Sequence, residues 1–345
     1  MVRAARIRAV AVTSRDVAER AGVSQSTVSL VLSGKAAGRV SARTVAAVEA
    51  AARELGYRPN AAARTLRTGR TRALGLVVPD VTNPFFGLLL RGAQSAARRH
   101  GYTVALVDVE RDPDARRSSL HALHSAAVDG YLTFEVDLGA VVPGWSEPTV
   151  AIEAWEGAAP KVRLDVEGGV QAAARHLLAL GHERIGRLRS MHPAETFAAR
   201  DRALAEVLGE IPTERAEHDI DDARRAALRL LAHGVTAVLC DDDVIAGGLY
   251  LAARETGTRI PADVSVVGFD DLDIARLVEP PLTTVAVHPE AFGAAAVERL
   301  LQEMEGEPGP DLIVAPTDLV VRESTGPPTA RSPRSGGTTG RRRQP

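Results

Sequence analysis

Residues 12–34 read VTSRDVAERAGVSQSTVSLVLSG and predict two short helices joined by a glycine turn. Thr13 followed three residues later by Asp16 is a capping-box pattern, which begins a helix. Gly22 can end that helix, and Ser24 is a preferred N-cap residue for a second helix of about eight residues. These are the proportions of a helix-turn-helix, a motif that places its second helix in the major groove of DNA.

A third helix and a basic composition complete this N-terminal region. Ser41 can cap the third helix, Gly56 stands where it would end, and apolar positions repeat between them at helical spacing: Val45, Val48, Ala52 and Leu55. Residues 1–70 contain 13 arginines and lysines against four acids, whereas the whole chain has a net charge of −2. A basic head on an acidic body favours contact with a polyanion, and a solvated basic arm is the alternative.

The second helix begins with short polar side chains, namely Gln25, Ser26, Thr27 and Ser29. Because the first residues of a recognition helix enter the major groove, these amide and hydroxyl groups can reach base edges. The alternative is the polar outer face of a small helical domain. Pattern and charge together predict an all-α DNA-binding domain over residues 13–58.

The composition of the whole chain excludes several classes of protein. Its 345 residues predict two or three domains, and 45% hydrophobic with 25% charged residues is ordinary for a globular protein. No apolar run reaches the ~18 residues that cross a bilayer, and the basic arm 1–12 lacks a signal-peptide apolar stretch. Cys240 is the single cysteine, so no intrachain disulfide can form. We therefore expect a cytoplasmic protein with no membrane association.

From residue 73 onward, short apolar runs alternate with helical stretches, the pattern of parallel sheets joined by crossover helices. Strands are expected at 73–80, 102–109, 130–135, 149–154, 184–190, 236–242 and 264–271. Helices are expected near 85–99, 113–127, 168–180, 197–208, 221–233, 243–257 and 289–304. So many elements exceed one sheet of usual width, which predicts an α/β core of two lobes. The tail 326–345 is rich in Pro, Gly, Ser, Thr and Arg and is predicted to be disordered.

The head resembles the LacI/GalR (lactose-repressor) family of bacterial transcriptional regulators. The resemblance rests on residues 12–34 and on RVSARTVAAVEAAARELGYRPNAAARTLRTGRT at 39–71. It implies that Gln25 and Ser26 contact bases, and that a further set contacts phosphates or positions the helix: Thr13, Ser24, Thr27, Ser29, Val40 and Ser41. Leu30 departs from the pattern, because many members carry a base-contacting arginine there. We therefore expect a different operator sequence.

A hinge is expected over residues 59–70. The stretch from Asn60 to Leu66 favours a helix of only about two turns, which is marginal in water by itself. The resemblance implies that this hinge helix folds on operator DNA, with Leu66 wedged into the minor groove, Ala63 allowing close approach and Asn60 contacting DNA. Unstacking a base step costs a few kcal/mol and is offset by the bent duplex contacting more protein. The alternative is a simple linker.

The body resembles the family's periplasmic-binding-protein-like core. The matching stretches are PDVTNPFF at 79–86, VDGYL at 128–132, RLDVEGGVQAAARHLLALGHERIG at 163–186, and RIPADVSVVGFDDLDIARLVEPPLTTV at 259–285. The resemblance implies an effector-binding and dimerisation region over 71–325. Its two lobes would comprise 71–162 with 288–315, and 163–287 with 316–325.

A small-molecule effector is expected between the lobes, because ligands of open α/β sheets bind outside the carboxyl ends of the strands. Asp242 follows the apolar run TAVLC and Asp270 follows VSVVGF, and both match positions that bind sugar hydroxyls in the family. The remaining candidates are Asn83, Phe85, Arg163 and Asp165, with Trp155 either stacking on a sugar ring or packing in a loop. Thr196 occupies the position of the family's ligand-binding arginine, and Arg200 is expected to replace it only if the loop is shifted. A sugar is the family's default effector.

Enzyme and metal sites are not indicated. The chain has no GxxxxGK[ST], GxGxxG, HExxH or GxSxG motif, and its nine histidines lack ligand-like spacing. Asp241, Asp242 and Asp243 are consecutive, so their side chains are expected to point in different directions rather than to hold a metal. We predict a dimeric repressor without a cofactor, binding a pseudo-palindromic double-stranded operator. The alternatives are an activator, a regulator that depends on a co-repressor or protein partner, and a sugar receptor or enzyme with a fused DNA-binding head.

Overall fold

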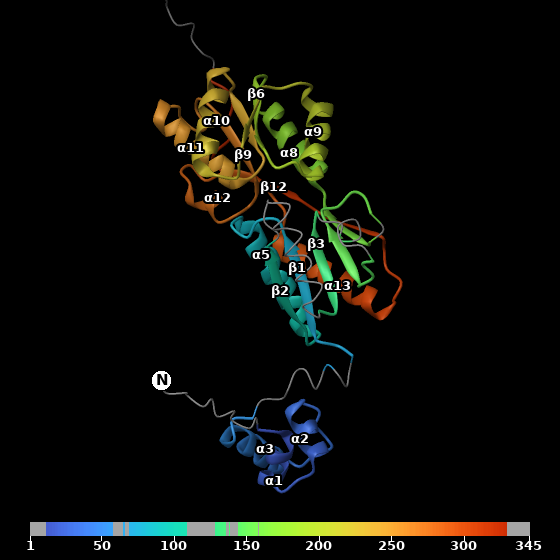
Figure 1. Cartoon of the computed structure of the whole chain (residues 1–345). Coiled ribbons are helices and arrows are strands. Elements are labelled where there is room, and N and C mark those ends of the chain that lie inside the picture. The colour runs from blue at the N-terminus through green and yellow to red at the C-terminus, as the bar shows by residue number, and fades with distance from the viewer. Residues whose placement is uncertain are drawn as a thin grey trace, which may run out of the picture. The chain divides into compact units, whose positions relative to one another are not determined.

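The computed structural model describes residues 12–57, 65, 69–108, 128–135, 138, 144–157 and 159–329 (Figure 1). The chain divides into two compact units, Met1–Thr71 and Arg72–Pro345. Several predictions lie outside the described residues: the arm 1–11, most of the hinge with Asn60, Ala63 and Leu66, the helix at 113–127, and the tail from 330 onward.

The first unit contains the three predicted helices, α1 (Ser14–Ala21), α2 (Gln25–Leu32) and α3 (Ala42–Glu54). Each begins at its expected cap: the hydroxyls of Thr13, Ser24 and Ser41 accept hydrogen bonds from backbone N–H groups of the first turn. The capping box is complete, because the Thr13 N–H donates to the Asp16 carboxylate at 2.7 Å. This bond holds the pKa of Asp16 below its ordinary value.

One buried apolar cluster holds these helices together. It joins the inward faces of all three through Val17, Val28 and Val48, each almost fully buried. Gly56 adopts a left-handed conformation just after α3, as expected of a glycine that ends a helix. The helix-turn-helix prediction is therefore confirmed at the level of helices, caps and core.

The second unit contains two six-stranded sheets. Sheet A has the strand order β11-β5-β4-β3-β1-β2, and sheet B has the order β12-β10-β9-β8-β6-β7. All paired strands are parallel except β10 and β12. The strands of sheet A are β1 (Ala73–Val78), β2 (Thr103–Asp108), β3 (Gly130–Phe134), β4 (Thr149–Ile152), β5 (Lys161–Leu164) and β11 (Leu312–Ala315). Those of sheet B are β6 (Ile185–Ser190), β7 (Thr213–Ala216), β8 (Ala237–Cys240), β9 (Ser265–Asp270), β10 (Thr283–Ala286) and β12 (Asp318–Val320).

Helices cover the sheets and define two lobes. Sheet A packs with α5 (Pro84–Arg99) and α13 (Pro289–Glu305), and we call this sheet with its two helices the first lobe. Sheet B and its helices form what we call the second lobe (Figure 1). On one side of the sheet lie α8 (Val166–Ala179) and α9 (Glu195–Leu208), and on the other lie α10 (Ile220–Ala232), α11 (Asp243–Thr256) and α12 (Ile274–Leu277). No described helix combines the length and apolar character needed to cross a bilayer.

Glycine permits the close contact between α5 and α13. A Cβ atom added at Gly92 would lie 1.9 Å from the carbonyl oxygen of Glu290, and one added at Gly293 would lie 2.2 Å from that of Leu89. Such distances are far below van der Waals contact, so any side chain at either position must push the two helices apart.

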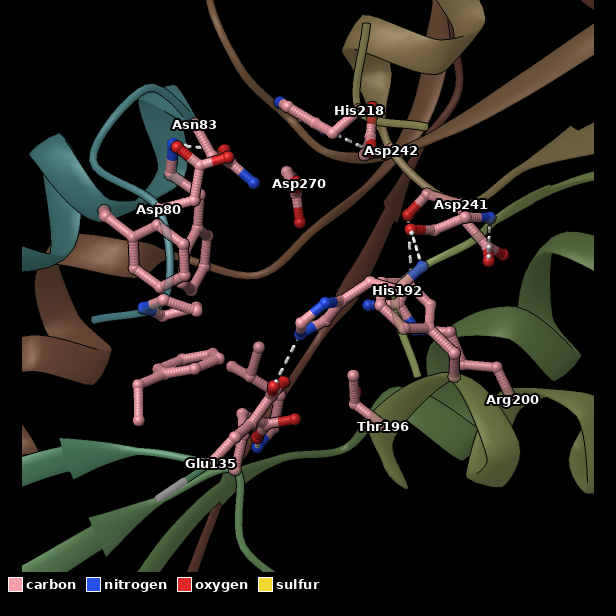
Figure 2. Close-up of a pocket in the computed structure, with 18 residues that line it drawn as sticks. Asp80, Asn83, Glu135, His192, Thr196, Arg200, His218, Asp241, Asp242 and Asp270 are labelled. Atoms are coloured by element: carbon pink, nitrogen blue, oxygen red, sulfur yellow. Dashed lines mark hydrogen bonds and ion pairs between the residues drawn. The ribbon is translucent and has the colours of Figure 1, made fainter. Parts of the chain in front are cut away.

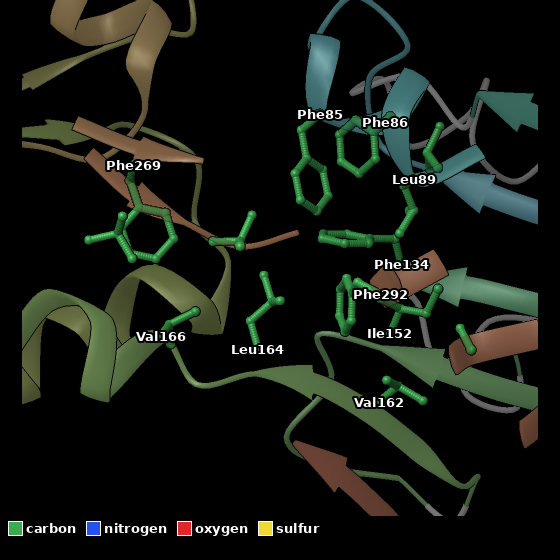
Figure 3. Close-up of a cluster of buried hydrophobic side chains, with 14 of the residues drawn as sticks. Phe85, Phe86, Leu89, Phe134, Ile152, Val162, Leu164, Val166, Phe269 and Phe292 are labelled. Carbon is green, nitrogen blue, oxygen red and sulfur yellow. The ribbon is translucent and has the colours of Figure 1, made fainter. Parts of the chain in front are cut away.

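The chain crosses between the lobes three times: between β5 and α8, between β10 and α13, and between β11 and β12. One apolar cluster continues through the first crossing, where Leu164 and Val166 lie between Phe134 in the first lobe and Phe269 in the second (Figure 3). The lobes therefore share a continuous apolar contact beside the crossing strands.

Candidate functional site

A pocket lies between the two lobes at the carboxyl ends of their strands (Figure 2). The empty space between its walls, including the open mouth, is about 760 Å³. Glu135 follows β3 and Glu153 follows β4 on the first-lobe side, while Asp270 ends β9 on the second-lobe side. The other lining residues are Pro79, Asp80, Asn83, Phe85, Phe86, Phe134, Leu164, Ser190, His192, Thr196, Phe197, Arg200, His218, Asp241 and Asp242.

The first-lobe wall is largely aromatic. Phe85, Phe86 and Phe134 pack edge to face, with ring centroids 4.9 to 5.9 Å apart. Asn83 begins α5 by accepting the Phe85 N–H at 2.9 Å. Because this bond uses the amide oxygen, the Asn83 amide nitrogen is the group left to donate to a ligand.

The three consecutive aspartates of the second-lobe wall point in different directions, as predicted. Asp241 accepts from Arg187 Nε and Nη2 at 2.9 and 2.7 Å. Asp242 lies 3.0 Å from His218 Nδ1, and Asp243 accepts the Thr284 hydroxyl at 2.6 Å. Of the three, only Asp241 and Asp242 line the pocket, where Asp241 is paired with Arg187 and Asp242 with His218.

Arg200 enters the pocket wall from the middle of α9, without a shifted loop. Its guanidinium is buried, donates from Nη1 to the carbonyl oxygen of Asp241 at 2.7 Å, and stacks 3.6 Å from the ring centroid of Phe269. Thr196 lies one turn earlier on the same helix and also lines the pocket. The expectation that Arg200 needs a shifted loop is wrong, because residues four apart on a helix share one face.

Several buried polar groups of the pocket have no hydrogen-bond partner. Among the described residues, five buried side-chain atoms are in this state, and three of them belong to the pocket: Glu153 Oε2, Thr196 Oγ1 and Arg200 Nε. Asp270 lines the same pocket and is 8% exposed. Buried polar groups are nearly always paired in folded proteins, so these three atoms indicate a site whose partner is a polar ligand or water.

Burial also changes the ionisation of this site. It raises the pKa of Glu153 to about 7, against the Leu164 N–H bond and the charge of Arg200. Burial, followed by the nearby carboxylates of Asp243 and Asp242, raises the pKa of Asp270 well above its ordinary value. Perturbed acids gathered in a cleft are typical of functional sites.

The backbone is strained at three acidic residues of the pocket wall. Glu135, Glu153 and Asp270 have φ values of 55°, 52° and 106°, a region that residues with a side chain rarely adopt. Each comes at the end of a strand, and each lines the pocket. Strain of this kind persists where the surrounding structure imposes it, commonly at ligand sites.

Five of the eight predicted effector residues line this pocket: Asn83, Phe85, Arg200, Asp242 and Asp270. The other three lie outside its wall and have different partners. Arg163 places its guanidinium 4.8 Å from the Trp155 ring centroid, and Trp155 packs against the apolar cluster. Asp165 caps α8 by accepting the Gly168 N–H at 3.0 Å.

Four further residues line the pocket without having been predicted from the sequence: Glu135, Glu153, His192 and His218. Glu135 and Glu153 could have been found by the signal that identified Asp242, namely an acidic residue at the carboxyl end of an apolar run. His192 and His218 come from loops after β6 and β7, and no local pattern marks them.

The first unit carries the candidate DNA-contacting residues. Gln25, Ser26 and Ser29 are exposed on α2, and Thr27 and Leu30 are half-buried beside them. The Ser24 hydroxyl lies 2.7 Å from that of Ser26 and 2.9 Å from that of Thr27. The half-buried Val40 precedes Ser41, the exposed cap of α3. Polar groups are thus presented at the start of α2, where a recognition helix contacts DNA.

Comparison with known proteins matches both units. Residues 13–60 match the family described as bacterial regulatory proteins, lacI family, and residues 174–325 match the periplasmic binding protein-like domain. A ribose operon repressor of Halalkalibacterium halodurans is 35% identical over 324 residues, covering 91% of this chain and 97% of that protein. The lac repressor dimer bound to operator and the anti-inducer ONPF is 29% identical with a TM-score of 0.80, covering 92% of this chain and 100% of that one. A LacI family transcriptional regulator of Enterococcus faecium with bound ribose is 26% identical with a TM-score of 0.68, covering 74% and 100%.

These likenesses confirm the predicted fold class, a helix-turn-helix head followed by a periplasmic-binding-protein-like core of two lobes with parallel sheets. All three compared proteins are named as repressors or regulators of transcription, and none as an enzyme.

Proposed function

Because the chain belongs to the lacI family of bacterial regulatory proteins, we propose that it is a sequence-specific DNA-binding regulator of transcription, acting as a dimeric repressor. A small molecule bound between the two lobes controls its affinity for the operator. The observation that carries this proposal is the pairing, in one chain, of a helix-turn-helix with an inter-lobe pocket whose buried polar groups lack partners. The pocket binds its ligand without a catalytic step, and the protein acts where the bacterial chromosome lies, in the cytoplasm.

On DNA, α2 contacts base edges through its first residues. Gln25 can pair its amide with adenine in the major groove, while Ser26 accepts several bases. Thr13, Ser24, Thr27, Ser29, Val40 and Ser41 contact phosphates or hold the helix in register. Leu30 supplies an apolar contact in place of a base-contacting arginine. Two heads related by a twofold axis contact two half-sites, and the hinges with Asn60, Ala63 and Leu66 contact the centre.

In the core, the ligand is a neutral polyol, most simply a monosaccharide. Asp242 and Asp270 accept hydroxyl hydrogen bonds, whereas Arg200 and Asn83 donate them, so hydroxyl groups that do both are well suited. Phe85 offers an apolar face to the ring. The acidic residues of the lining disfavour an anion. Two compared proteins support this class, since one is named for the ribose operon and another contains ribose.

Ligand and operator are coupled through the same equilibrium between lobe arrangements. If the ligand weakens operator binding by some factor, the operator must weaken ligand binding by the same factor. A co-repressing ligand would instead strengthen operator binding, and the operator would then strengthen ligand binding by the same factor.

Selection of binding sites from a random duplex pool with the purified protein, at near-physiological salt, tests the DNA-binding part of the proposal. The expected result is enrichment of a pseudo-palindrome with a flexible central step. Recovery of all sequences equally, with binding that weakens steeply as salt is added, would contradict sequence-specific binding, because such binding reflects phosphate contacts alone.

A further inference from the structure

A hydrogen bond between a histidine and a carboxylate joins the two lobes across the pocket. His192 Nε2 lies 2.9 Å from Glu135 Oε2, and Figure 2 shows the two side chains meeting between the walls. Glu135 directly follows β3 in the first lobe, whereas His192 follows β6 in the second. The pair therefore closes only when the ends of these two strands approach each other.

Each partner is held by its own lobe. The Glu135 N–H donates to the carbonyl oxygen of Ile152 at 2.9 Å, which fixes the residue to β4 despite its positive φ. The His192 N–H donates to Ser190 Oγ at 3.2 Å, and its ring lies edge to face on Phe197 with centroids 6.2 Å apart. Because the backbone of both residues is held by its own lobe, a change in lobe separation must change the distance between Glu135 and His192.

The pair is the more exposed part of the pocket. The side chains of His192 and Glu135 are 31% and 14% exposed, whereas Glu153 and Arg200 are 2% and 5% exposed. Solvent therefore reaches the pair more readily than the unpartnered groups. A partly buried, charge-assisted contact is also stronger than a fully exposed one.

We propose that Glu135 and His192 form a gate between the lobes, which holds them closed over the deeper, unpartnered groups of the pocket. When the pair is made, the closed arrangement is favoured even without ligand. When it is broken, the lobes separate and the deeper groups become accessible. That the gate controls a ligand rests on the proposed function, but its effect on lobe closure does not.

The test measures lobe separation by double electron–electron resonance, with one spin label in each lobe and neither DNA nor ligand present. Suitable exposed sites are Ala205 on α9 and Glu305 at the end of α13, each replaced by cysteine. The native Cys240 is buried, and burial raises the pKa of its thiol, so it labels poorly. Labelled subunits are mixed with excess unlabelled protein, which removes distances between subunits.

Glu135→Ala and His192→Ala are each expected to lower the ratio of closed to open molecules by about fivefold to tenfold. The double variant is expected to match either single one, because both remove the same contact. Exchanging the charges, with Glu135→Lys and His192→Glu together, is expected to restore closure. This exchange also keeps the test valid if a single variant fails to fold.

The matched control is Glu214→Ala, which breaks a contact of 2.7 Å with Arg229 inside the second lobe alone and is expected to leave the distances unchanged. The gate is refuted if native protein is mainly open, if the single variants keep the native distribution, or if the control shifts it equally. Any of these results leaves the DNA-binding proposal standing, since no DNA or ligand is used. A failure to select an operator would likewise leave the gate standing.

Discussion

Replacing Glu153 by glutamine tests the electrostatics of the pocket. The residue is 2% exposed, its Oε1 accepts the Leu164 N–H at 2.5 Å, and the Thr196 side chain is near enough to lower its pKa in part. Burial raises its pKa from 4.5 to about 7. Glutamine has nearly the same shape, can keep the bond to Leu164, and never ionises, so the substitution isolates the effect of charge.

The sign of the effect follows from proton binding. Between pH 4.5 and about 7 the folded protein keeps a proton on Glu153 that the unfolded chain has lost. The free energy of unfolding must therefore fall as pH rises through this range, and it stays lower at higher pH. At 1.36 kcal/mol per unit, the full difference is about 3 kcal/mol. Glu153→Gln should gain about 2 to 3 kcal/mol relative to native protein between pH 5 and pH 8.

Urea unfolding followed by tryptophan fluorescence measures this difference. Trp145 and Trp155 both lie in the first lobe, which also contains Glu153, so the signal reports the correct part of the chain. Both proteins are compared at several pH values from 5 to 8. A difference in unfolding free energy that stays constant over this range would refute the assignment of a buried, protonated carboxyl to Glu153.

Three further substitutions test other parts of the structure. Arg187→Ala leaves the buried Asp241 carboxylate without its cation and should lower the free energy of unfolding by about 3–5 kcal/mol. Circular dichroism should show a lower urea midpoint, and an unchanged midpoint would contradict the pairing. Gly92→Ala should cost about 1–3 kcal/mol by overpacking α5 against α13, whereas Gly87→Ala on the same helix, where a new Cβ meets no atom within 4 Å, should not. Asp270→Ala should abolish the change in operator affinity caused by an effector found by thermal-shift screening, with effector-free DNA binding intact; a fully responsive variant would remove Asp270 from the site.

Local signals predicted the elements of the chain well. Caps at Thr13, Ser24 and Ser41 fix helix starts by hydrogen bonds within one turn, so sequence alone locates them. The seven expected strands are all present, and apolar runs such as ALGLVV at 73–78 gave the signal for most of them. Five strands were missed, and they are short or contain charges, as in KVRL at 161–164 and TERA at 213–216. Such strands form because a neighbouring strand already offers its edge, which no local pattern records.

The site was only partly predictable for a similar reason. Residues at strand ends, such as Asp242 and Asp270, follow from the general rule for α/β sheets. Glu153 obeys the same rule, but its partners become clear only when β4 and α9 face each other across the cleft. The contact between His192 and Glu135 joins residues 57 positions apart, in different lobes, and depends on how far the lobes are closed.

The most direct test of the central claim is the ratio of affinities for the selected operator and for a random duplex, measured by fluorescence anisotropy at near-physiological salt. A sequence-specific regulator should bind its operator at least about a thousandfold more tightly. Gln25→Ala should lower that ratio by about tenfold or more, through loss of discrimination at one base position, and should change binding to the random duplex little. A native ratio near one, or equal losses on both duplexes in the variant, would contradict the assignment of this chain as a regulator that recognises DNA sequence through α2.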